Sequence, residues 1–243
     1  MTTRSFVLFD LGGTLVDLRG IGSSMSERLQ VDLGIAPDQA DGLALEWARR
    51  TADRLPRAQG RKFRPQRDLA AEALAELLTG RAISFDSGRL VSGAWADFAQ
   101  TCVLHDDASV DWIRSLRSRS DGLALVTDGD TDAVTPVVER LGLRPLFDAA
   151  IISEKVRAYK PNPKIYRAAM KELKASPGES IFVSDSPVDL GGADALGLST
   201  ALIDRGLFYD TAVGPPGFIR LARLTDLETV LHRRATTGRF GMP

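Results

Sequence analysis

The sequence predicts an α/β fold, a doubly wound and mostly parallel sheet with an inserted α-helical cap domain. Two observations predict this fold. Short, continuous apolar runs alternate with segments of helical period, and a long stretch with helical patterns alone interrupts the alternation after the first run. At 243 residues, the chain is long enough to bury a full-sized core.

Four short apolar runs are the predicted strands: Phe6–Phe9, Leu123–Val126, Ile181–Val183 and Thr200–Ile203. None shows the polar alternation of a half-exposed strand, which indicates burial on both faces of a parallel sheet. The helices of the core are predicted at Ser109–Arg119, Asp132–Leu141, Pro163–Leu173 and Asp189–Leu196. Strands that alternate with helices in this way are typical of βαβ units.

The stretch from about residue 18 to residue 100 contains no convincing strand. Its helical patterns cover Ser24–Leu33, Asp38–Leu55, Arg67–Leu78 and Gly88–Gln100. We therefore expect residues 1–17 and 106–243 to form the core and residues 18–105 to form the cap, with hinges at Asp17–Gly22 and Leu104–Asp107. Residues 235–243 carry few large apolar side chains and are predicted to be a flexible tail.

The composition argues against several classes of protein. The formal net charge of −1 does not favour a nucleic-acid partner. The single cysteine, Cys102, excludes an intrachain disulfide, and the two histidines, His105 and His232, are too few for a zinc site. No apolar run approaches the roughly 20 residues of a membrane span. We expect a cytoplasmic protein without a membrane partner, and either a monomer or a homodimer.

Polar residues follow the predicted strands, where open parallel sheets bind their ligands. They are Asp10-Leu11-Gly12-Gly13-Thr14 after the first strand, Thr127-Asp128-Gly129 after the second, and Ser184-Asp185-Ser186 after the third, with Asp189 one helical turn further on. Lys160 precedes a proline between the second and third groups. Because the carboxyl ends of parallel strands share one edge, we expect these residues to converge on one site.

These motifs resemble, in order, the four motifs of the haloacid dehalogenase-like superfamily. FDLGGTLVD resembles the first motif, LVTDG the second, the lysine of YKPNP the third and VSDSPVD the fourth. The helical stretch resembles the α-helical cap that one branch inserts between the first two motifs. The resemblance implies a hydrolase with a Rossmann-like core, and a phosphate monoester of a small metabolite as its substrate.

In this resemblance Asp10 is the nucleophile, and a carboxylate is chemically suited to form a covalent intermediate that splits one displacement into two easier ones. Gly12 and Gly13 would let backbone N–H groups approach the phosphate, and Thr127, Asp128 and Lys160 would complete the substrate-binding set. Thr127 and Lys160 would also act in catalysis, by stabilising charge on the phosphoryl oxygens. Mg²⁺ is the implied cofactor. Asp10, Asp185 and the carbonyl of Gly12 would hold it, with Asp189 bound directly or through water.

The chain departs from the family at Gly12, where the phosphatases carry a second aspartate that protonates the leaving group. Such assistance is worth ~10²–10⁴-fold in rate. A phosphatase acting on a good leaving group would tolerate the loss, or another acid would replace it, for which His105, Asp106, Asp17 and Lys62 are candidates. The alternatives are a haloacid dehalogenase, a phosphonate-cleaving hydrolase with Lys62 as its cap lysine, and a phosphate-binding or interaction module without turnover.

The cap also contains a run of arginines that is open to two interpretations. The run comprises Arg49, Arg50, Arg54, Arg57, Arg61 and Arg64. These side chains either meet an anionic substrate or form a solvated face, and the second is the more common fate of a basic helical stretch.

Overall fold

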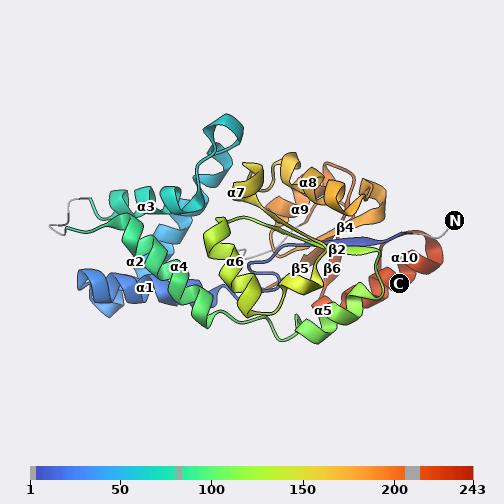
Figure 1. Ribbon diagram of the computed structural model, residues 1–243, viewed down its shortest axis with the longest axis horizontal. Helices are drawn as coiled ribbons and strands as arrows, with labels where there is room; N and C mark the ends of the chain where they lie inside the picture. Colours follow the sequence, from blue (N-terminus) through green and yellow to red (C-terminus); the bar gives the residue numbers. More distant parts are fainter. Residues whose placement is uncertain (1–3, 80, 82–83, 206–213, 243) are drawn as a thin grey trace.

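The structure is a computed structural model that describes residues 4–79, 81, 84–205 and 214–242. A block of helices forms one end of an elongated molecule, and a sheet covered by helices forms the other end (Figure 1). The predicted hinge and helix positions can therefore be compared with the structure along most of the chain. The end of the predicted tail, Pro243, lies outside the described residues.

All six strands of the sheet run parallel in the order β3-β2-β1-β4-β5-β6. They are β1 Phe6–Phe9, β2 Gly122–Thr127, β3 Ala149–Ile152, β4 Ser180–Ser184, β5 Ser199–Ile203 and β6 Ile219–Leu221. This arrangement confirms the predicted α/β class. The sequence analysis missed β3 and β6, whereas β1, β2, β4 and β5 coincide with predicted strands to within a residue or two.

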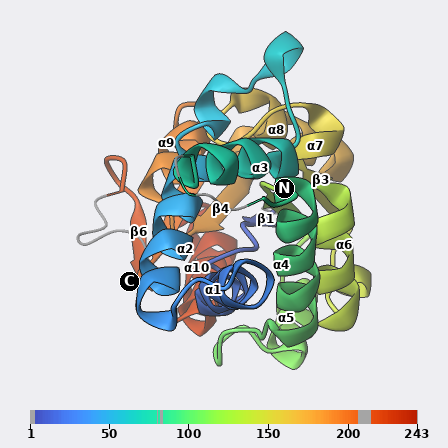
Figure 2. The same cartoon turned by 90° about the vertical axis from the view of Figure 1, so that its left-hand side faces the viewer.

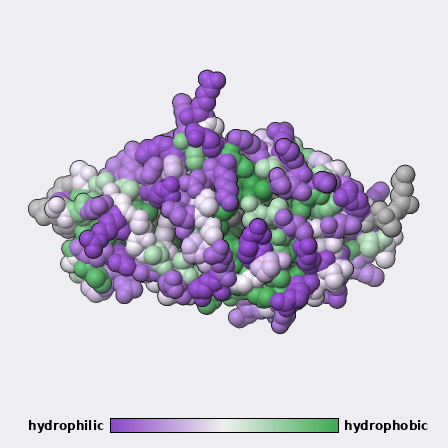
Figure 3. Space-filling view, viewed as in Figure 1, coloured by the Kyte–Doolittle hydropathy of each residue, from purple (hydrophilic) through white to green (hydrophobic). Residues whose placement is uncertain are grey.

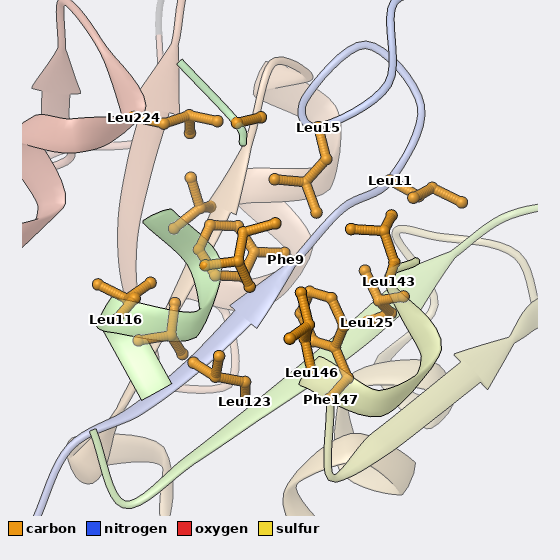
Figure 4. Packing of buried hydrophobic residues seen from close by; sticks show 14 of the residues in the cluster. Phe9, Leu11, Leu15, Leu116, Leu123, Leu125, Leu143, Leu146, Phe147 and Leu224 are labelled. Atoms are coloured by element: carbon orange, nitrogen blue, oxygen red, sulfur yellow. The ribbon is translucent and has the colours of Figure 1, made fainter. Parts of the chain in front are cut away.

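Helices cover both faces of the sheet. One face carries α8 (Pro163–Leu173) and α9 (Pro187–Asp194), and the other carries α5 (Val110–Arg117), α6 (Thr131–Arg140) and α10 (Leu227–Thr237), as Figure 1 shows for the helices it labels on each side. Alternate residues of β1 point to opposite faces, so Phe9 packs among Leu125, Leu146 and Phe147 in the cluster of Figure 4. The same alternation places Phe6 and Leu8 in the cluster under α8. Central strands buried on both faces explain why their sequences are continuously apolar.

The helical block consists of α1 (Arg19–Leu33), α2 (Pro37–Ala52), α3 (Gln66–Leu77) and α4 (Ser87–Thr101). Seen from its own side in Figure 2, the block lies in front of the sheet. It has a separate hydrophobic cluster around Trp47, whose indole N–H donates to the carbonyl of Ala70 at 2.8 Å. We refer to these helices and their connections as the cap.

Shorter elements complete the chain. A short helix, α7, covers Ser153–Val156, and single 3₁₀ turns lie at Leu55–Arg57, Gly60–Lys62, Arg144–Leu146, Pro177–Glu179 and Leu224–Asp226. None of the described helices is long and apolar enough to cross a membrane.

The two connections between cap and core lie side by side. Val16 and Leu104 form an antiparallel bridge, flanked by hydrogen bonds from the Asp17 N–H to the carbonyl of Val103 and from the His105 N–H to that of Leu15, both 2.9 Å. Helix α1 begins at Arg19, so most of the predicted hinge 17–22 is helical. The pairing makes the two connections one short, ordered junction.

A second contact joins the cap to the core at the N-terminus of α3. The carboxylate of Asp130 accepts from the backbone N–H groups of Gln66 and Arg67, at 2.8 and 2.7 Å. Nearby, the Gln59 side chain accepts from the N–H of Tyr159 at 3.0 Å. The cap is therefore held to the core on the side of the lysine motif as well as at the junction.

The C-terminal segment differs from the expected flexible tail. Residues 235–237 belong to α10, and Phe240 packs against the large core cluster. The guanidinium of Arg234 also lies 4.8 Å from the centroid of the Phe240 ring. One aromatic residue thus attaches a segment that its composition suggested would be free.

Candidate active site

The loop after β1 is closed by its own backbone. The N–H groups of Leu15 and Val16 both donate to the carbonyl of Leu11, and the Gly13 N–H donates to the carbonyl of Val16, all at 2.9 Å. Gly13 has φ 77°, and a Cβ on it would lie 2.3 Å from Oδ2 of Asp185. A glycine is needed here because the carboxylate after β4 occupies the space of a side chain.

This geometry corrects the role expected for Gly13. Its N–H is used within the loop and is not available to a phosphate oxygen. Gly12 differs, because it lines the active-site cavity and its main-chain N–H and carbonyl make no hydrogen bond within the described part of the chain. Gly12 is therefore the glycine placed to meet a ligand.

Thr14 and Asp185 connect the loop after β1 to the loop after β4. The Thr14 hydroxyl accepts from the N–H of Asp185 at 3.0 Å and lies 3.3 Å from Oδ1 of the same carboxylate, to which it donates. Two hydrogen bonds with Thr14 thus hold Asp185 beside the first motif.

Lys160 lies at the centre of the site. Its Nζ is 2.5 Å from Oδ1 of Asp10 and 2.9 Å from Oδ2 of Asp189, and its side chain is 3% exposed. Its backbone N–H donates to Oδ1 of Asp128 at 3.0 Å. The buried ammonium of Lys160 and its two carboxylate partners form a charge network. If one member is removed, the buried charges of the remaining members are no longer balanced.

Asp10 is also held by hydrogen bonds from the chain around it. The N–H of Leu11 donates to its Oδ1 at 2.7 Å, and the hydroxyl of Ser184 lies 3.3 Å from its Oδ2. The carboxylate is therefore fixed in orientation on both oxygens, as a nucleophile that must attack in one direction requires.

Acidic side chains outnumber basic ones in this site, where Asp10, Asp128, Asp185 and Asp189 surround the one ammonium of Lys160. Burial raises the pKa of Asp10, against the opposing effect of Lys160. Desolvation raises the pKa of Asp128 to about 8, and burial together with the charge of Asp10 raises the pKa of Asp185 to about 7. Burial alone would lower the pKa of Lys160, but the surrounding carboxylates hold it well above its usual value.

This donor set fits a hard divalent cation. In the described ranges, no three His, Cys, Asp or Glu side chains are grouped as a metal site. Magnesium commonly takes only one or two carboxylates and fills its other positions with water and substrate phosphate. Asp10, Asp185 and the unbonded carbonyl of Gly12 would supply that protein share. The surplus of carboxylates over cations is the observation that favours such an ion.

A cavity of about 650 Å³ lies between the cap and the carboxyl edge of the sheet. Its lining contains all the predicted site residues except Gly13, namely Asp10, Gly12, Thr127, Asp128, Lys160, Asp185 and Asp189. The Thr127 hydroxyl lies 3.2 Å from the carbonyl of Asp128 within its own loop. The structure therefore brings the four motifs together at one cavity.

The residues suggested as replacement acids do not line this cavity. Asp17 is ion-paired with Arg19, and Asp106 and Lys62 are exposed. Burial, with the charge of Arg205, lowers the pKa of His105, which disfavours its charged form. None of these four side chains replaces the aspartate that is absent at position 12.

The arginine run of the cap also lies outside the cavity. Arg50 pairs with Glu46, Arg54 with Glu76, and Arg64 with Glu72. These side chains form the solvated face that was one of the two interpretations.

The sequence placed Thr14 and Ser184 among the residues that converge on the site but gave them no role, and it did not predict one whole wall of the site. The apolar wall includes Leu18, Ile21, Met25, Trp95 and Phe98 of the cap. No local pattern distinguishes these residues from ordinary core positions of amphipathic helices.

Comparison with known proteins adds the family context. A profile described as haloacid dehalogenase-like hydrolase matches residues 5–197. Haloacetate dehalogenase H-2 of Moraxella sp. (strain B) is 34% identical over 107 residues, which cover 44% of this chain and 48% of that enzyme. Phosphoglycolate phosphatase of Salmonella paratyphi A is 26% identical over 85% of this chain and 84% of that enzyme. (S)-2-haloacid dehalogenase 4A of Burkholderia cepacia is 27% identical, with 82% of each chain covered.

Solved structures show the same fold. The defluorinating L-2-haloacid dehalogenase Rha0230 has a TM-score of 0.75 and 27% identity, covering 94% of this chain and 95% of that one. The putative HAD-hydrolase YfnB from Bacillus subtilis, bound to magnesium, has a TM-score of 0.77 and 18% identity, covering 94% and 99%. At that lower identity the likeness concerns the fold alone.

Proposed function

Because the chain belongs to the haloacid dehalogenase-like hydrolases, we propose that it is a magnesium-dependent phosphatase that acts on a small phosphorylated metabolite through an aspartyl-phosphate on Asp10. The observation that carries the proposal is that the buried carboxyl group of Asp185 lines the same cavity as Asp10 and is held beside the loop of Asp10 by two hydrogen bonds with Thr14. A second carboxylate near the nucleophile repels any anionic substrate unless a cation comes between them. A phosphate ester bound together with Mg²⁺ meets that requirement.

Asp10 would attack phosphorus with one carboxylate oxygen. The bond between phosphorus and the ester oxygen breaks, and the released oxyanion takes a proton from water. Water then attacks the aspartyl-phosphate, which frees inorganic phosphate and restores Asp10. When bound, magnesium supplies the positive charge that lets a phosphate approach these carboxylates.

The other side chains hold the reacting groups and their charges. Lys160, with its Nζ 2.5 Å from Oδ1 of Asp10, places an ammonium where negative charge develops on the phosphoryl oxygens. The Gly12 N–H is a further donor at the same cavity, whereas the Thr127 hydroxyl, which donates to the carbonyl of Asp128, would have to turn to reach a phosphate oxygen. Ser184 and Leu11 keep the carboxylate of Asp10 oriented. Because position 12 carries no acid, the substrate is expected to have a leaving group that needs little protonation.

A second candidate, hydrolysis of a carbon–halogen bond, is favoured by the same Gly12. A halide leaves without a proton, so a dehalogenase has no use for the missing acid. The phosphonate-cleaving alternative finds no support, because Lys62 is exposed and does not line the cavity. A dehalogenase needs no metal ion, so the carboxylates in excess of Lys160 would have no cation to offset them. For that reason we rank dehalogenation second.

Parallel assays of both reactions test the proposal. Protein treated with EDTA is given p-nitrophenyl phosphate or 2-chloropropionate, with and without added Mg²⁺, and the release of nitrophenol and of chloride is followed. We expect nitrophenol release only with Mg²⁺ and no chloride release. Chloride release without metal would establish the dehalogenase instead. Folded protein that binds Mg²⁺ but turns over neither compound, nor an acyl phosphate, would indicate an interaction module.

A further inference from the structure

We propose that the phosphate is attached to an uncharged and largely apolar phenol, held in the part of the cavity that the cap encloses. This inference rests on the proposed phosphatase function and adds the chemical class of the leaving group. It concerns the walls of the cavity away from Asp10, which have no part in the chemistry of phosphoryl transfer.

Those walls are apolar on several sides. Ile21 and Met25 come from α1, Trp95 and Phe98 from α4, and Val134 and Val137 from α6 of the core. On the face drawn in Figure 3, hydrophobic surface appears near the middle of the molecule, where the cap adjoins the core. A cavity of about 650 Å³ is large enough for a ring together with the phosphate. An apolar group that enters this space loses contact with water on the sides that these residues cover.

The cap offers no positive charge to a second anionic group. Among the described lining residues there is no arginine, and the one lysine, Lys160, is already paired with Asp10 and Asp189. The one charged side chain that the cap contributes is that of Asp53, which is negative. A carboxylate or a second phosphate on the leaving group would therefore be desolvated without a cation to pair with.

The cap also offers few hydrogen bonds to a sugar. The Thr51 hydroxyl donates to the carbonyl of Trp47 at 2.9 Å inside α2, so its donor is in use. Besides Asp53 and the indole N–H of Trp95, the polar side chain that remains on this wall is Gln66. A polyol would lose more hydrogen bonds to water than this wall replaces. A phenol fits both this wall and the absence of an acid at position 12.

A series of para-substituted phenyl phosphates tests this inference. Phenyl, 4-ethylphenyl, 4-propylphenyl and 4-(carboxymethyl)phenyl phosphate have leaving groups of similar basicity, so differences in kcat/KM report the contact with the cavity wall. We expect kcat/KM to rise about threefold to fourfold for each added CH₂ that is buried. We expect 4-(carboxymethyl)phenyl phosphate to be at least about tenfold poorer than the 4-ethyl ester, because like charges meet.

The outcomes separate this inference from the function on which it rests. If phenyl phosphate is hydrolysed with Mg²⁺ but the alkyl series is flat, or the carboxymethyl ester is the best substrate, the inference is overturned and the phosphatase function stands. If none of the four esters is hydrolysed and acyl phosphates are also inert, the phosphatase function falls and takes the inference with it.

A pair of variants on one helix sharpens the test. Ile21→Lys places a cation in the wall of the cavity, whereas Val31→Lys places one on the exposed side of α1, where Val31 is 71% exposed. We expect Ile21→Lys to raise the ratio of kcat/KM for the carboxymethyl ester over the 4-ethyl ester about tenfold or more. The control should leave that ratio unchanged. An unchanged ratio in Ile21→Lys would overturn the inference, and should that variant not fold, the substrate series on the unaltered protein still decides.

Discussion

The two halves of the active-site cavity are built on different principles. The half formed by the core carries four carboxyl groups and an ammonium. They lie in the loops after β1, β2 and β4, in the lysine motif and in the first turn of α9, and ion pairs and hydrogen bonds hold them. The half formed by the cap carries apolar side chains from α1 and α4 and one exposed carboxylate. Polar groups must be positioned accurately where bonds form and break. Shape complementarity and the exclusion of water are sufficient where the substrate's leaving group is selected. Changes in one half should therefore alter rate, and changes in the other should alter preference.

The largest effect is expected from Asp10→Asn, which removes the nucleophile from the core half. An amide does not attack phosphorus, so we expect kcat to fall by at least about 10³-fold. The measurement is steady-state hydrolysis of p-nitrophenyl phosphate with saturating Mg²⁺. As a control, we compare the affinity for an apolar product phenol with that for a carboxylated one. The ratio of the two affinities should be the same for the unaltered enzyme, measured by inhibition, and for the variant, measured by binding. Appreciable activity of Asp10→Asn would mean that the nucleophile is another residue.

A smaller loss of activity is expected from Asp185→Asn, which keeps the shape of the side chain and removes its negative charge. We expect the Mg²⁺ concentration for half-maximal activity to rise about tenfold or more, because one of two carboxylate ligands is lost. Asp194→Asn is a matched control, since it makes the same substitution at the exposed end of α9, outside the cavity lining. An unchanged Mg²⁺ dependence in Asp185→Asn would remove the main support for a metal-dependent phosphatase.

Gly12→Asp is expected to add the acid that the core half lacks. A Cβ at Gly12 would lie 3.1 Å from Cδ1 of Leu18, so the Leu18 side chain must move by a few tenths of an ångström. We expect hydrolysis of an alkyl phosphate to rise about tenfold, below the ~10²–10⁴-fold worth of a well-placed general acid. The same variant should change aryl phosphate hydrolysis little. Equal gains on both esters would show that proton delivery is not what the protein lacks.

The smallest effect concerns the junction between the halves and is measured as stability. Asp107 accepts from Arg205 at 2.8 Å and from the N–H of Leu224 at 2.8 Å, and Arg205 also donates to the carbonyl of Thr14. Burial raises the pKa of Asp107, but these hydrogen bonds outweigh burial and hold the pKa below its ordinary value. The Asp107 carboxylate therefore contributes to the free energy of unfolding above the ordinary pKa of an unfolded aspartate. This contribution is lost as the pH falls through the lower pKa that Asp107 has in the folded protein.

We therefore expect Asp107→Asn to lower the free energy of unfolding at pH 7 by about 1.5–3 kcal/mol, the value of a hydrogen bond to a charged group. The difference between variant and parent should shrink as the pH is lowered below about 4, the ordinary pKa of aspartate. Urea denaturation at several pH values measures this difference in the free energy of unfolding. A difference that does not change with pH would mean that the charge of Asp107 is not what stabilises the junction.

The sequence predicted the core half well because its signals are local. Each central strand is a continuous apolar run, and a polar motif follows it directly, so residues such as Asp10 and Asp185 could be assigned to one sheet edge before the structure was known. Strand β3 escaped notice because Ala149 and Ala150 make half of it, and β6 because Ile219–Leu221 is a three-residue edge strand. Short, alanine-rich or edge strands carry too little hydrophobic signal to be recognised alone.

The cap half could not be predicted in the same way. Ile21 and Phe98 are apolar residues of helices, and whether such a residue faces the Trp47 cluster or the cavity depends on how α1 and α4 pack. The role of Gly13 likewise depends on a distant partner, because it is Asp185 that excludes a side chain there. Contacts of this kind are set by tertiary packing and leave no periodic signal in the sequence.

Identification of the covalent intermediate tests the central claim most directly. Enzyme with Mg²⁺ is mixed with an aryl phosphate, quenched in acid within the first turnover, and digested for mass spectrometry. We predict that the peptide containing Asp10 carries one phosphoryl group on that aspartate, and that the Asp10→Asn protein carries none. Turnover of the aryl phosphate without phosphate on Asp10 would contradict it. So would an ester formed on Asp10 with loss of chloride after incubation with 2-chloropropionate.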